Sequence, residues 1–352
     1  MVTVREFGVT KDGRTVSCYR IPAGAACLEV LDYGCTVHRL EVPDRDGKMT
    51  DVCLGYDTVG EYEANDGYLG GVIGRHGNRI CRGRFTLNGT AYRLNCNDGE
   101  NHLHGGAKGF DKYIWQAEIL EDGVLFSRCS EDGEEGYPGN LHVQVEYRFT
   151  RDYQWILEYR AESDRDTVVN MTNHCYFNLN GSGSGDVKGH MLRLNAGAFT
   201  ENGPGCLPNG RILPVEHTVF DFRGGKMLGR DLELDEEQLR AVGGYDHNFV
   251  LEQTAAADKE LPEEAGALWS GKSGICMKIY TTQPGIQVYM ANVLTDRPGK
   301  DGAQYHPHDG VCLETQHFPN SMECPEFPSI VLKKGEKYRQ ATIYEFGVTG
   351  AI

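Results

Sequence analysis

The chain has 352 residues, of which 39% are hydrophobic and 45 are glycine, so it can form a large core with many tight turns. Its formal net charge of −16 repels nucleic acid and anionic membrane surfaces, and the sequence has no basic patch to offset this repulsion. No apolar run approaches the ~18 residues that span a bilayer, and the N-terminus lacks an apolar signal segment. We therefore expect a cytoplasmic protein that binds neither nucleic acid nor membranes.

The 12 cysteines are spread from Cys18 to Cys324 and include no Cys-x-x-Cys pair. Several lie inside strand-like runs, as Cys312 does between Val311 and Leu313. Disulfide frameworks are typical of small secreted chains, so we interpret these residues as buried free thiols.

Strand patterns recur at short intervals along the chain. The alternation of apolar and polar residues is clearest over 141–150. Asn88-Gly89 lies between two short alternating runs and predicts a hairpin turn, because both residues tolerate positive φ. The predicted strands are 27–31, 35–42, 84–87, 91–94, 124–129, 141–150, 154–161, 275–282, 286–293 and 311–315.

Helical signals are weak and short, at 58–63 and 231–242. The segments 181–185 and 258–267 are predicted to be loops and not domain linkers, because the strand patterns on either side keep the same character. Length alone would allow two domains. The lack of repeated strand–helix–strand units instead favours a single all-β domain over residues 1–352, a large antiparallel β-sandwich with few short helices.

A further strand-like stretch, residues 169–179, separates polar and apolar residues onto two faces. The apolar face is Val169, Met171, Cys175, Phe177 and Leu179, and the polar face is Asn170, Thr172, His174, Tyr176 and Asn178. The polar face has too few Lys and Glu residues for a plain solvated surface, and it suits a ligand rich in hydroxyls, such as a sugar. The alternative is a structural histidine on a solvated strand.

Four other segments combine turn residues with dense polar groups, at 74–80, 101–106, 244–249 and 313–319. Gln287 adds an amide that points opposite to Ile286 and Val288 on a predicted strand. Together these segments supply His, Glu, Asp, Arg, Asn and Gln side chains. That set matches the polar groups of a sugar pocket.

These motifs resemble the aldose 1-epimerase (galactose mutarotase) family over roughly residues 70–320. Seven motifs occur in the expected order, among them Gly74-Arg75-x-x-Asn78-Arg79-Ile80, Asn101-x-Leu103-His104-Gly105-Gly106, Thr172-Asn173-His174-x-Tyr176-Phe177 and Leu313-Glu314-Thr315-Gln316. Any one motif is weak, but seven in sequence are specific. The resemblance implies a mutarotase-type β-sandwich with the sugar in a groove across one sheet, no cofactor and no metal.

The resemblance also implies a set of roles. His174 is expected to be the general acid and Glu314 the general base of sugar ring opening and reclosure. The residues expected to bind hydroxyls are Asn78, Arg79, His104, Asp246 and Gln287. The partner is then a small aldohexose, and the protein a monomer or homodimer; preference between galactose and glucose stays open, because the two differ only at the C4 hydroxyl.

Several alternatives remain open from the sequence. His76 replaces a small apolar residue of the family pattern and is either a pocket-rim residue or a partly exposed loop histidine. His102 and His247 are expected to point away from the sugar, and Arg75 is ambiguous.

The sequence is also compatible with three rival functions. The spacings His102-x-His104 and His306-x-His308 are compatible with a metal, although no third ligand lies at a recognisable interval. A non-catalytic sugar-binding protein on the same fold would be expected to lack His174 or Glu314. A hexose phosphate would need basic residues near the groove, for which Arg75, Arg79 and Arg82 are the candidates.

Overall fold

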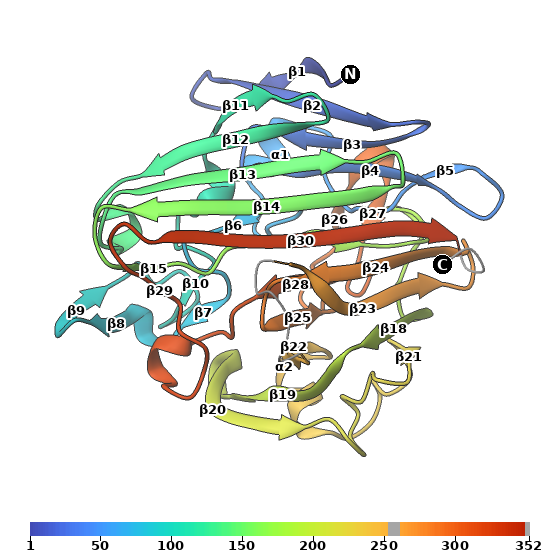
Figure 1. The fold of residues 1–352 in the computed structure, drawn as a ribbon. Coiled ribbons are helices and arrows are strands. Elements are labelled where there is room, and N and C mark those ends of the chain that lie inside the picture. The colour runs from blue at the N-terminus through green and yellow to red at the C-terminus, as the bar shows by residue number, and fades with distance from the viewer. Residues whose placement is uncertain (253–260, 349–352) are drawn as a thin grey trace.

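The computed structural model describes residues 1–252 and 261–348, and two large sheets form an antiparallel β-sandwich (Figure 1). The larger sheet has nine strands in the order β11 (Gln116–Ile119), β12 (Gly123–Ser130), β13 (Leu141–Phe149), β14 (Gln154–Ser163), β30 (Lys337–Val348), β24 (Ile275–Thr281), β23 (Glu263–Ser270), β18 (His190–Leu194) and β21 (Lys226–Met227). The second has six, in the order β17 (Tyr176–Phe177), β28 (Val311–Gln316), β25 (Gly285–Tyr289), β22 (Asp246–Leu251), β19 (Ala196–Gly203) and β20 (Leu207–Pro214).

The other elements surround this sandwich. A five-stranded sheet of N-terminal strands lies at the top of Figure 1: β1 (Thr3–Val9), β2 (Thr15–Ala23), β3 (Ala26–Leu31), β4 (Val37–Pro43) and β5 (Met49–Asp51). Two-stranded ladders join β6 (Val72–Ile73) to β16 (Thr172–Asn173), β7 (Arg79–Ile80) to β10 (His102–Leu103), β8 (Arg84–Leu87) to β9 (Thr90–Arg93), β15 (Thr167–Val168) to β29 (Val331–Leu332), and β26 (Arg297–Pro298) to β27 (Gln304–Tyr305). The α-helices are α1 (Val59–Glu63) and α2 (Glu237–Val242).

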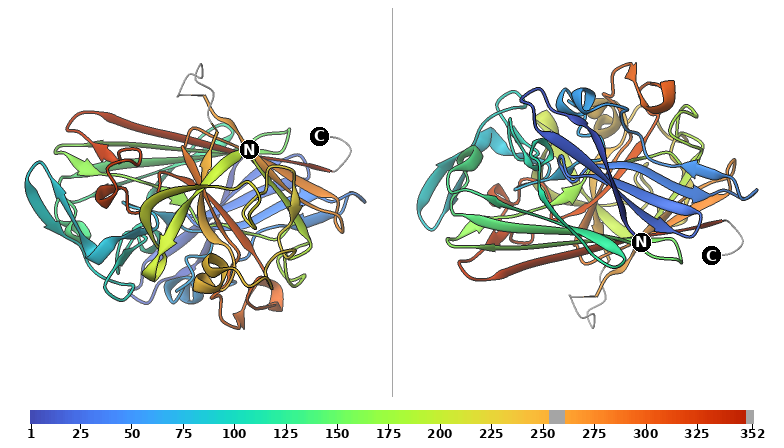
Figure 2. Two further views of the ribbon diagram at one scale, coloured as in Figure 1. Left: turned by 90° about the horizontal axis from the view of Figure 1, so that it is seen from below. Right: turned by 90° about the horizontal axis from the view of Figure 1, so that it is seen from above.

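Aromatic side chains fill the space between the two large sheets, which Figure 2 shows nearly edge-on. The ring of Trp155 on β14 stacks on Tyr344 of β30 at 4.8 Å and on Tyr147 of β13 at 6.0 Å between centroids. Phe177 of the opposite sheet meets Tyr344 at 5.2 Å, and the Tyr344 hydroxyl donates to the Leu313 carbonyl at 3.1 Å. Stacked rings and one buried hydrogen bond thus connect the face of the larger sheet to β17 and β28.

The prediction of an antiparallel β-sandwich is confirmed, and the clearest sequence patterns correspond to the clearest strands. On β13 the apolar residues Leu141, Val143, Val145, Tyr147 and Phe149 are all buried. The predicted Asn88-Gly89 turn joins β8 to β9 with φ of 51° and 76°, the positive values that such a hairpin requires.

Three local predictions need correction. The stretch 169–179 is no continuous strand: β16 pairs with β6 and β17 pairs with β28, while His174 and Cys175 lie between them. Both of its faces are buried, because the chain passes from one ladder to another inside the molecule. The helix predicted at 231–242 forms only as α2, and the loop predicted at 258–267 contains the start of β23 at Glu263, while residues 258–260 lie outside the described residues.

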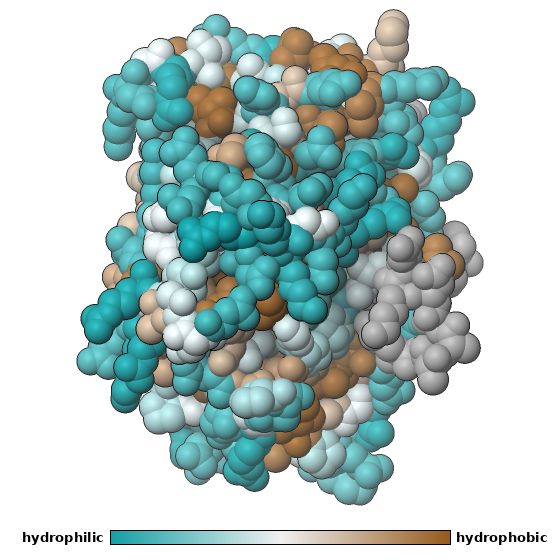
Figure 3. All heavy atoms as spheres, turned by 60° about the vertical axis from the view of Figure 1, so that its left-hand side comes forward, coloured by the Kyte–Doolittle hydropathy of each residue, from teal (hydrophilic) through white to brown (hydrophobic). Residues whose placement is uncertain are grey.

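All 12 cysteines are free thiols. The prediction that they are buried holds for seven of them, whereas Cys96 and Cys129 are exposed. Within residues 1–252 and 261–348, no helix has the length and apolar character to span a membrane. The face shown in Figure 3 is mostly hydrophilic, with hydrophobic residues in small groups between polar ones.

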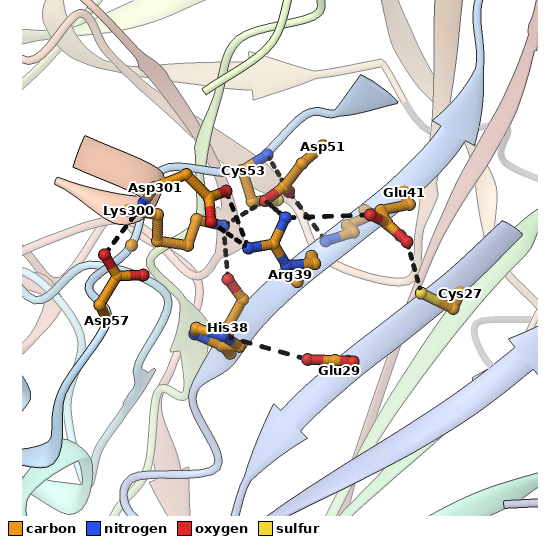
Figure 4. Close-up of polar contacts among 12 residues, drawn as sticks. Cys27, Glu29, His38, Arg39, Glu41, Asp51, Cys53, Asp57, Lys300 and Asp301 are labelled. Carbon is orange, nitrogen blue, oxygen red and sulfur yellow. Dashed lines mark hydrogen bonds and ion pairs between the residues drawn. The ribbon is translucent and has the colours of Figure 1, made fainter. Parts of the chain in front are cut away.

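A buried ion network fixes the segment that follows β26. Lys300 is fully buried, and its Nζ donates to Asp51 Oδ2 at 2.6 Å and to the His38 carbonyl at 2.5 Å (Figure 4). Arg39 on β4 joins the same network through Asp51 at 3.5 Å and Asp301 at 2.9 Å. Because these contacts cross from β4 and β5 to residues 300–301, they hold the chain next to Arg297 in place.

Arg75, which the sequence left ambiguous, is a buried structural cation. Its guanidinium donates to the carbonyl oxygens of Ser130, Glu131, Pro138 and Gly139 at 2.8–2.9 Å and to Ser130 Oγ at 2.8 Å. Burial lowers the pKa of Arg75 to about 10, so the group stays charged at neutral pH. It therefore ties the loop at 74–78 to the end of β12 and to the turn before β13.

Replacing Arg75 by methionine should lower the free energy of unfolding by about 3 kcal/mol or more, because several buried carbonyl oxygens would lose their donor at once. Urea unfolding followed by circular dichroism measures this. The matched control is Arg84→Met on β8, where the side chain is exposed and we expect a change below about 0.5 kcal/mol. Equal stability of the two variants would contradict the structural role of Arg75.

Candidate functional site

A pocket of about 270 Å³ is lined by residues from segments far apart in the sequence. Six of the seven predicted site residues line it: Asn78, Arg79, His104, His174, Asp246 and Glu314. The seventh, Gln287, lies behind Asp246 and donates from Nε2 to its Oδ1 at 2.6 Å. The structure therefore brings all seven residues together, with Gln287 outside the lining.

The register of the six-stranded sheet brings the two acidic residues of this pocket, Glu314 and Asp246, to the same face. Gln287 on β25 stands directly opposite Glu314 on β28 and opposite Asn248 on β22. Directly opposite residues of antiparallel strands project to the same face. The three side chains consequently form one polar row across the sheet. Asp246, the first residue of β22, lies two residues before Asn248 and therefore projects from the same face.

The imidazole of His174 reaches the pocket from the break between β16 and β17. Its Nε2 lies 3.7 Å from Glu314 Oε1, and both side chains are buried. The ring of His104 meets the His174 ring edge-on, at 5.1 Å between centroids. A carboxyl group and two imidazoles thus converge on one small cavity.

A tight loop next to β10 sets the orientation of His104. His104 has a φ of 51°, its N–H donates to the Asn78 carbonyl at 3.1 Å, and its Nδ1 accepts the Asn78 N–H at 3.1 Å. The following residue must be glycine, because a Cβ on Gly105 would lie 1.8 Å from the Gly74 carbonyl oxygen and φ there is +87°. Since Nδ1 of His104 accepts a hydrogen bond, the proton of the neutral ring is on Nε2.

Burial shifts the ionisation of the converging groups in opposite directions. It lowers the pKa of His174 to about 4 and that of His104 well below its usual range. Burial, with a smaller contribution from the charge of Asp246, raises the pKa of Glu314 well above its ordinary value. Arg79 opposes that rise and also opposes the burial that raises the pKa of Asp246. A neutral imidazole next to a carboxyl group that retains its proton is the expected resting form.

Metal ligands converge here in a way that the sequence did not predict. One ligand atom each from His104, His174 and Glu314 lie within 4.8 Å of one another. His102 is not among them: its ring nitrogens contact the Tyr137 hydroxyl and the Asn95 carbonyl, both at 2.6 Å. His104 nevertheless fits a metal poorly, because a ring with its proton on Nε2 has no lone pair to offer on the pocket side.

The second histidine pair considered for a metal also fails to converge. His306 Nδ1 contacts Asp296 Oδ1 at 2.8 Å, whereas His308 Nδ1 contacts the Met290 carbonyl at 2.9 Å. The two rings thus engage different partners.

Two more histidines near the motifs lie away from the pocket. His247 points as expected into the core, where its ring lies 4.7 Å from that of Phe220. His76 is fully buried and outside the pocket lining, so neither the rim position nor the partly exposed loop is correct. The backbone of His76 forms an isolated β-bridge with Asn170, and this pairing holds the loop inside the protein.

Several lining residues were missed by the sequence analysis. Tyr68 packs against the rings of His104 at 4.6 Å and His174 at 5.9 Å, and Tyr176 and Tyr289 also contact the His174 ring. Tyr176 lies on the polar face that the sequence already marked, and Tyr289 ends another of the seven motifs, Pro284-Gly285-x-Gln287-x-Tyr289, so both had an available signal. Tyr68 and the rim residue Arg297 lie in no motif, and only the fold brings them to the pocket.

A larger groove, of about 1010 Å³, crosses the outer face of β12, β13, β14 and β30. Its lining includes exposed polar side chains such as His142, Gln144 and Glu162, and it contains none of the predicted site residues. The smaller pocket, where ionisable groups are buried together, is therefore the candidate site.

Comparison with known proteins agrees with these observations. The family model for aldose 1-epimerase matches residues 17–345. The chain is 42% identical to a galactose mutarotase of Sus scrofa over 99% of both proteins, and 38% identical to an aldose 1-epimerase of Escherichia coli over 91% of both. The crystal structure of galactose 1-epimerase from Lactobacillus acidophilus has a TM-score of 0.84 at 25% identity and 99% coverage of both chains. The fold is thus of the galactose mutarotase type, and the chain belongs to the aldose 1-epimerase family.

Proposed function

We propose that the protein is an aldose 1-epimerase that interconverts the α and β anomers of neutral aldohexoses such as glucose and galactose. The observation that carries this proposal is the distance of 3.7 Å between Glu314 Oε1 and His174 Nε2. The two atoms lie in a pocket of about 270 Å³ whose polar side chains can bind sugar hydroxyls. Anomer exchange needs one group to remove a proton and another to supply one, and these two side chains can do both.

In the proposed mechanism the proton of the pair first passes from the Glu314 carboxyl group to His174 Nε2. The Glu314 carboxylate then takes the proton of the C1 hydroxyl, while the His174 imidazolium gives its Nε2 proton to the ring oxygen. The bond between C1 and the ring oxygen breaks, C1 becomes an aldehyde, and the C1–C2 bond rotates. Closure reverses both proton transfers on the other face of the aldehyde. Asn78, Arg79, His104 and Asp246 are proposed to hold the sugar hydroxyls, and Gln287 to orient Asp246 through the hydrogen bond at 2.6 Å.

Neutral sugars suit this pocket better than their phosphates. Arg79 is bonded to Asp98 at 2.7 Å and Arg297 to Asp66 at 2.5 Å, so both guanidinium groups at the pocket are already paired with carboxylates. Of the other candidates for a phosphate, Arg75 is buried against β12 and Arg82 is exposed outside the pocket lining. A phosphate would also meet the overall charge of −16.

The rival reading, a non-catalytic sugar-binding protein, would need the pocket but not the acid–base pair. The presence of both His174 and Glu314 at short range favours catalysis over binding alone. We also propose a cytoplasmic location, which suits a chain of 12 free thiols. A single domain that acts as a monomer or homodimer on free sugars completes the proposal.

The catalytic pair is tested by Glu314→Gln and His174→Asn, each of which should slow anomer exchange by about 10²-fold or more. Polarimetry of fresh α-glucose, α-galactose and glucose 6-phosphate measures the rate above the spontaneous one. The controls are the same changes on the outer face of the larger sheet, Glu162→Gln and His142→Asn, which should keep full activity. Near-full activity of either site variant would refute the assignment, and sugar binding without turnover by the unmodified protein would support the rival.

The pH dependence follows from the opposite pKa shifts. The imidazolium of His174 is lost as pH rises through about 4, and Glu314 loses its proton only above its ordinary range, so the pair holds one proton between these limits. If that one-proton form is active, kcat/KM should follow a broad bell whose limbs belong to the pair as a whole. Measured rates that rise to a plateau without a basic limb would show that only one ionisation matters.

Metal removal should leave activity unchanged, because the Nε2 proton of His104 opposes coordination from the pocket side. Dialysis against a strong chelator followed by polarimetry tests this, with zinc added back to half of the sample. A loss of activity that zinc alone restores would instead make His104, His174 and Glu314 a metal site.

A further inference from the structure

Strand β28 contacts both ring nitrogens of His174. Glu314 Oε1 lies 3.7 Å from Nε2, and Cys312 Sγ lies 3.4 Å from Nδ1. Cys312 and Glu314 are two residues apart on the strand, so their side chains project from the same face. All three side chains are buried, which leaves the thiol as the contact that the strand makes with the far side of the imidazole.

We propose that Cys312 is a positioning residue for His174, whose thiol stays the hydrogen-bond partner of Nδ1 throughout the reaction and so keeps Nε2 directed at the sugar. This inference rests on the proposed mutarotase function. It assigns no proton transfer to the thiol, because Cys312 begins and ends each cycle with its S–H intact.

A thiol is suited to this task because its sulfur can accept a weak hydrogen bond from Nδ1–H without carrying a charge. In the resting form Nε2 faces the Glu314 carboxyl group, which keeps its proton, so the proton of the neutral ring is on Nδ1 and Nδ1–H donates to the Cys312 sulfur. When Nε2 takes the Glu314 proton and His174 becomes an imidazolium, Nδ1–H still donates to the sulfur. Burial raises the pKa of Cys312 well above its usual value, so the thiol adds no charge. A carboxylate in this position would favour the imidazolium and oppose the low pKa of His174.

The aromatic neighbours cannot replace this contact. Tyr68, Tyr176 and Tyr289 pack around the His174 ring with centroids 5.0–6.1 Å away. Packing of this kind fixes the plane of the ring. It barely distinguishes the two orientations that differ by a 180° rotation about the Cβ–Cγ bond, although this rotation exchanges the positions of nitrogen and carbon atoms in the ring. The Sγ to Nδ1 contact does distinguish them, as the Asn78 N–H does for His104.

Kinetics of three variants test the proposal. Cys312→Ala should lower kcat by about tenfold with KM changed less than about twofold, because sugar binding is kept while the acid is misdirected. Cys312→Ser, which restores a donor and acceptor, should recover most of the lost kcat. Cys53→Ala is the control, since it removes an equally buried thiol that contacts Cys175 and not the His174 ring. Equal kcat values for Cys312→Ala and Cys53→Ala, or no recovery with serine, would overturn the proposal.

A second readout needs no substrate and so separates this proposal from the proposed function. Nitrogen-15 NMR of histidine-labelled protein reports which ring nitrogen carries the proton, and comparison with His174→Asn identifies the His174 signals among the 12 histidines. We expect the Nδ1–H form in the unmodified protein and a mixture of both forms in Cys312→Ala. An Nε2–H form in the unmodified protein, or an unchanged spectrum in the variant, would refute the positioning role whether or not the protein is a mutarotase.

Discussion

The burial of a carboxyl group and an imidazole side by side is the constraint on which the rest of this structure depends. Glu314 is 2% exposed and His174 4%, so neither side chain is stabilised by bulk water. Two separated buried charges would cost several kcal/mol each, whereas one proton held between the pair avoids that cost. The scaffold must therefore hold both groups closely enough to exchange protons with a sugar and must supply the remaining polar contacts itself.

The break between β16 and β17 makes this arrangement possible. A continuous strand would put His174 in one ladder, whereas the break lets β16 pair with β6 and β17 with β28. The backbone of the break stays bonded: the His174 N–H donates to the Gly71 carbonyl at 2.9 Å and its carbonyl accepts the Gly70 N–H at 3.0 Å. Glycines 70 and 71 thereby replace the missing ladder partner, and the imidazole is free to meet β28.

Buried cations hold the irregular segments that carry the rest of the site. Arg75 bonds four carbonyl oxygens and anchors the loop that continues into Asn78 and Arg79. Lys300 does the same for the chain beside Arg297, through Asp51 and the His38 carbonyl. Loops have no ladder to fix their position, so each depends on a few strong, fully desolvated contacts, and disturbing one of these cations would move site residues that it never touches.

The strands with regular alternation, such as 141–149, and the Asn88-Gly89 turn can be predicted from the sequence alone, because they depend on local periodicity and backbone preference. The ordered motifs also identified six residues that line the pocket, because each motif specifies the side chains that the family resemblance assigns to the sugar site. Three features could not be predicted in this way: the break at His174, the hydrogen bond of Gln287 to Asp246, and the presence of Tyr68, Arg297 and Cys312 around the pocket. Those features arise from contacts between segments far apart in the chain, and no local pattern encodes the distance between two such segments.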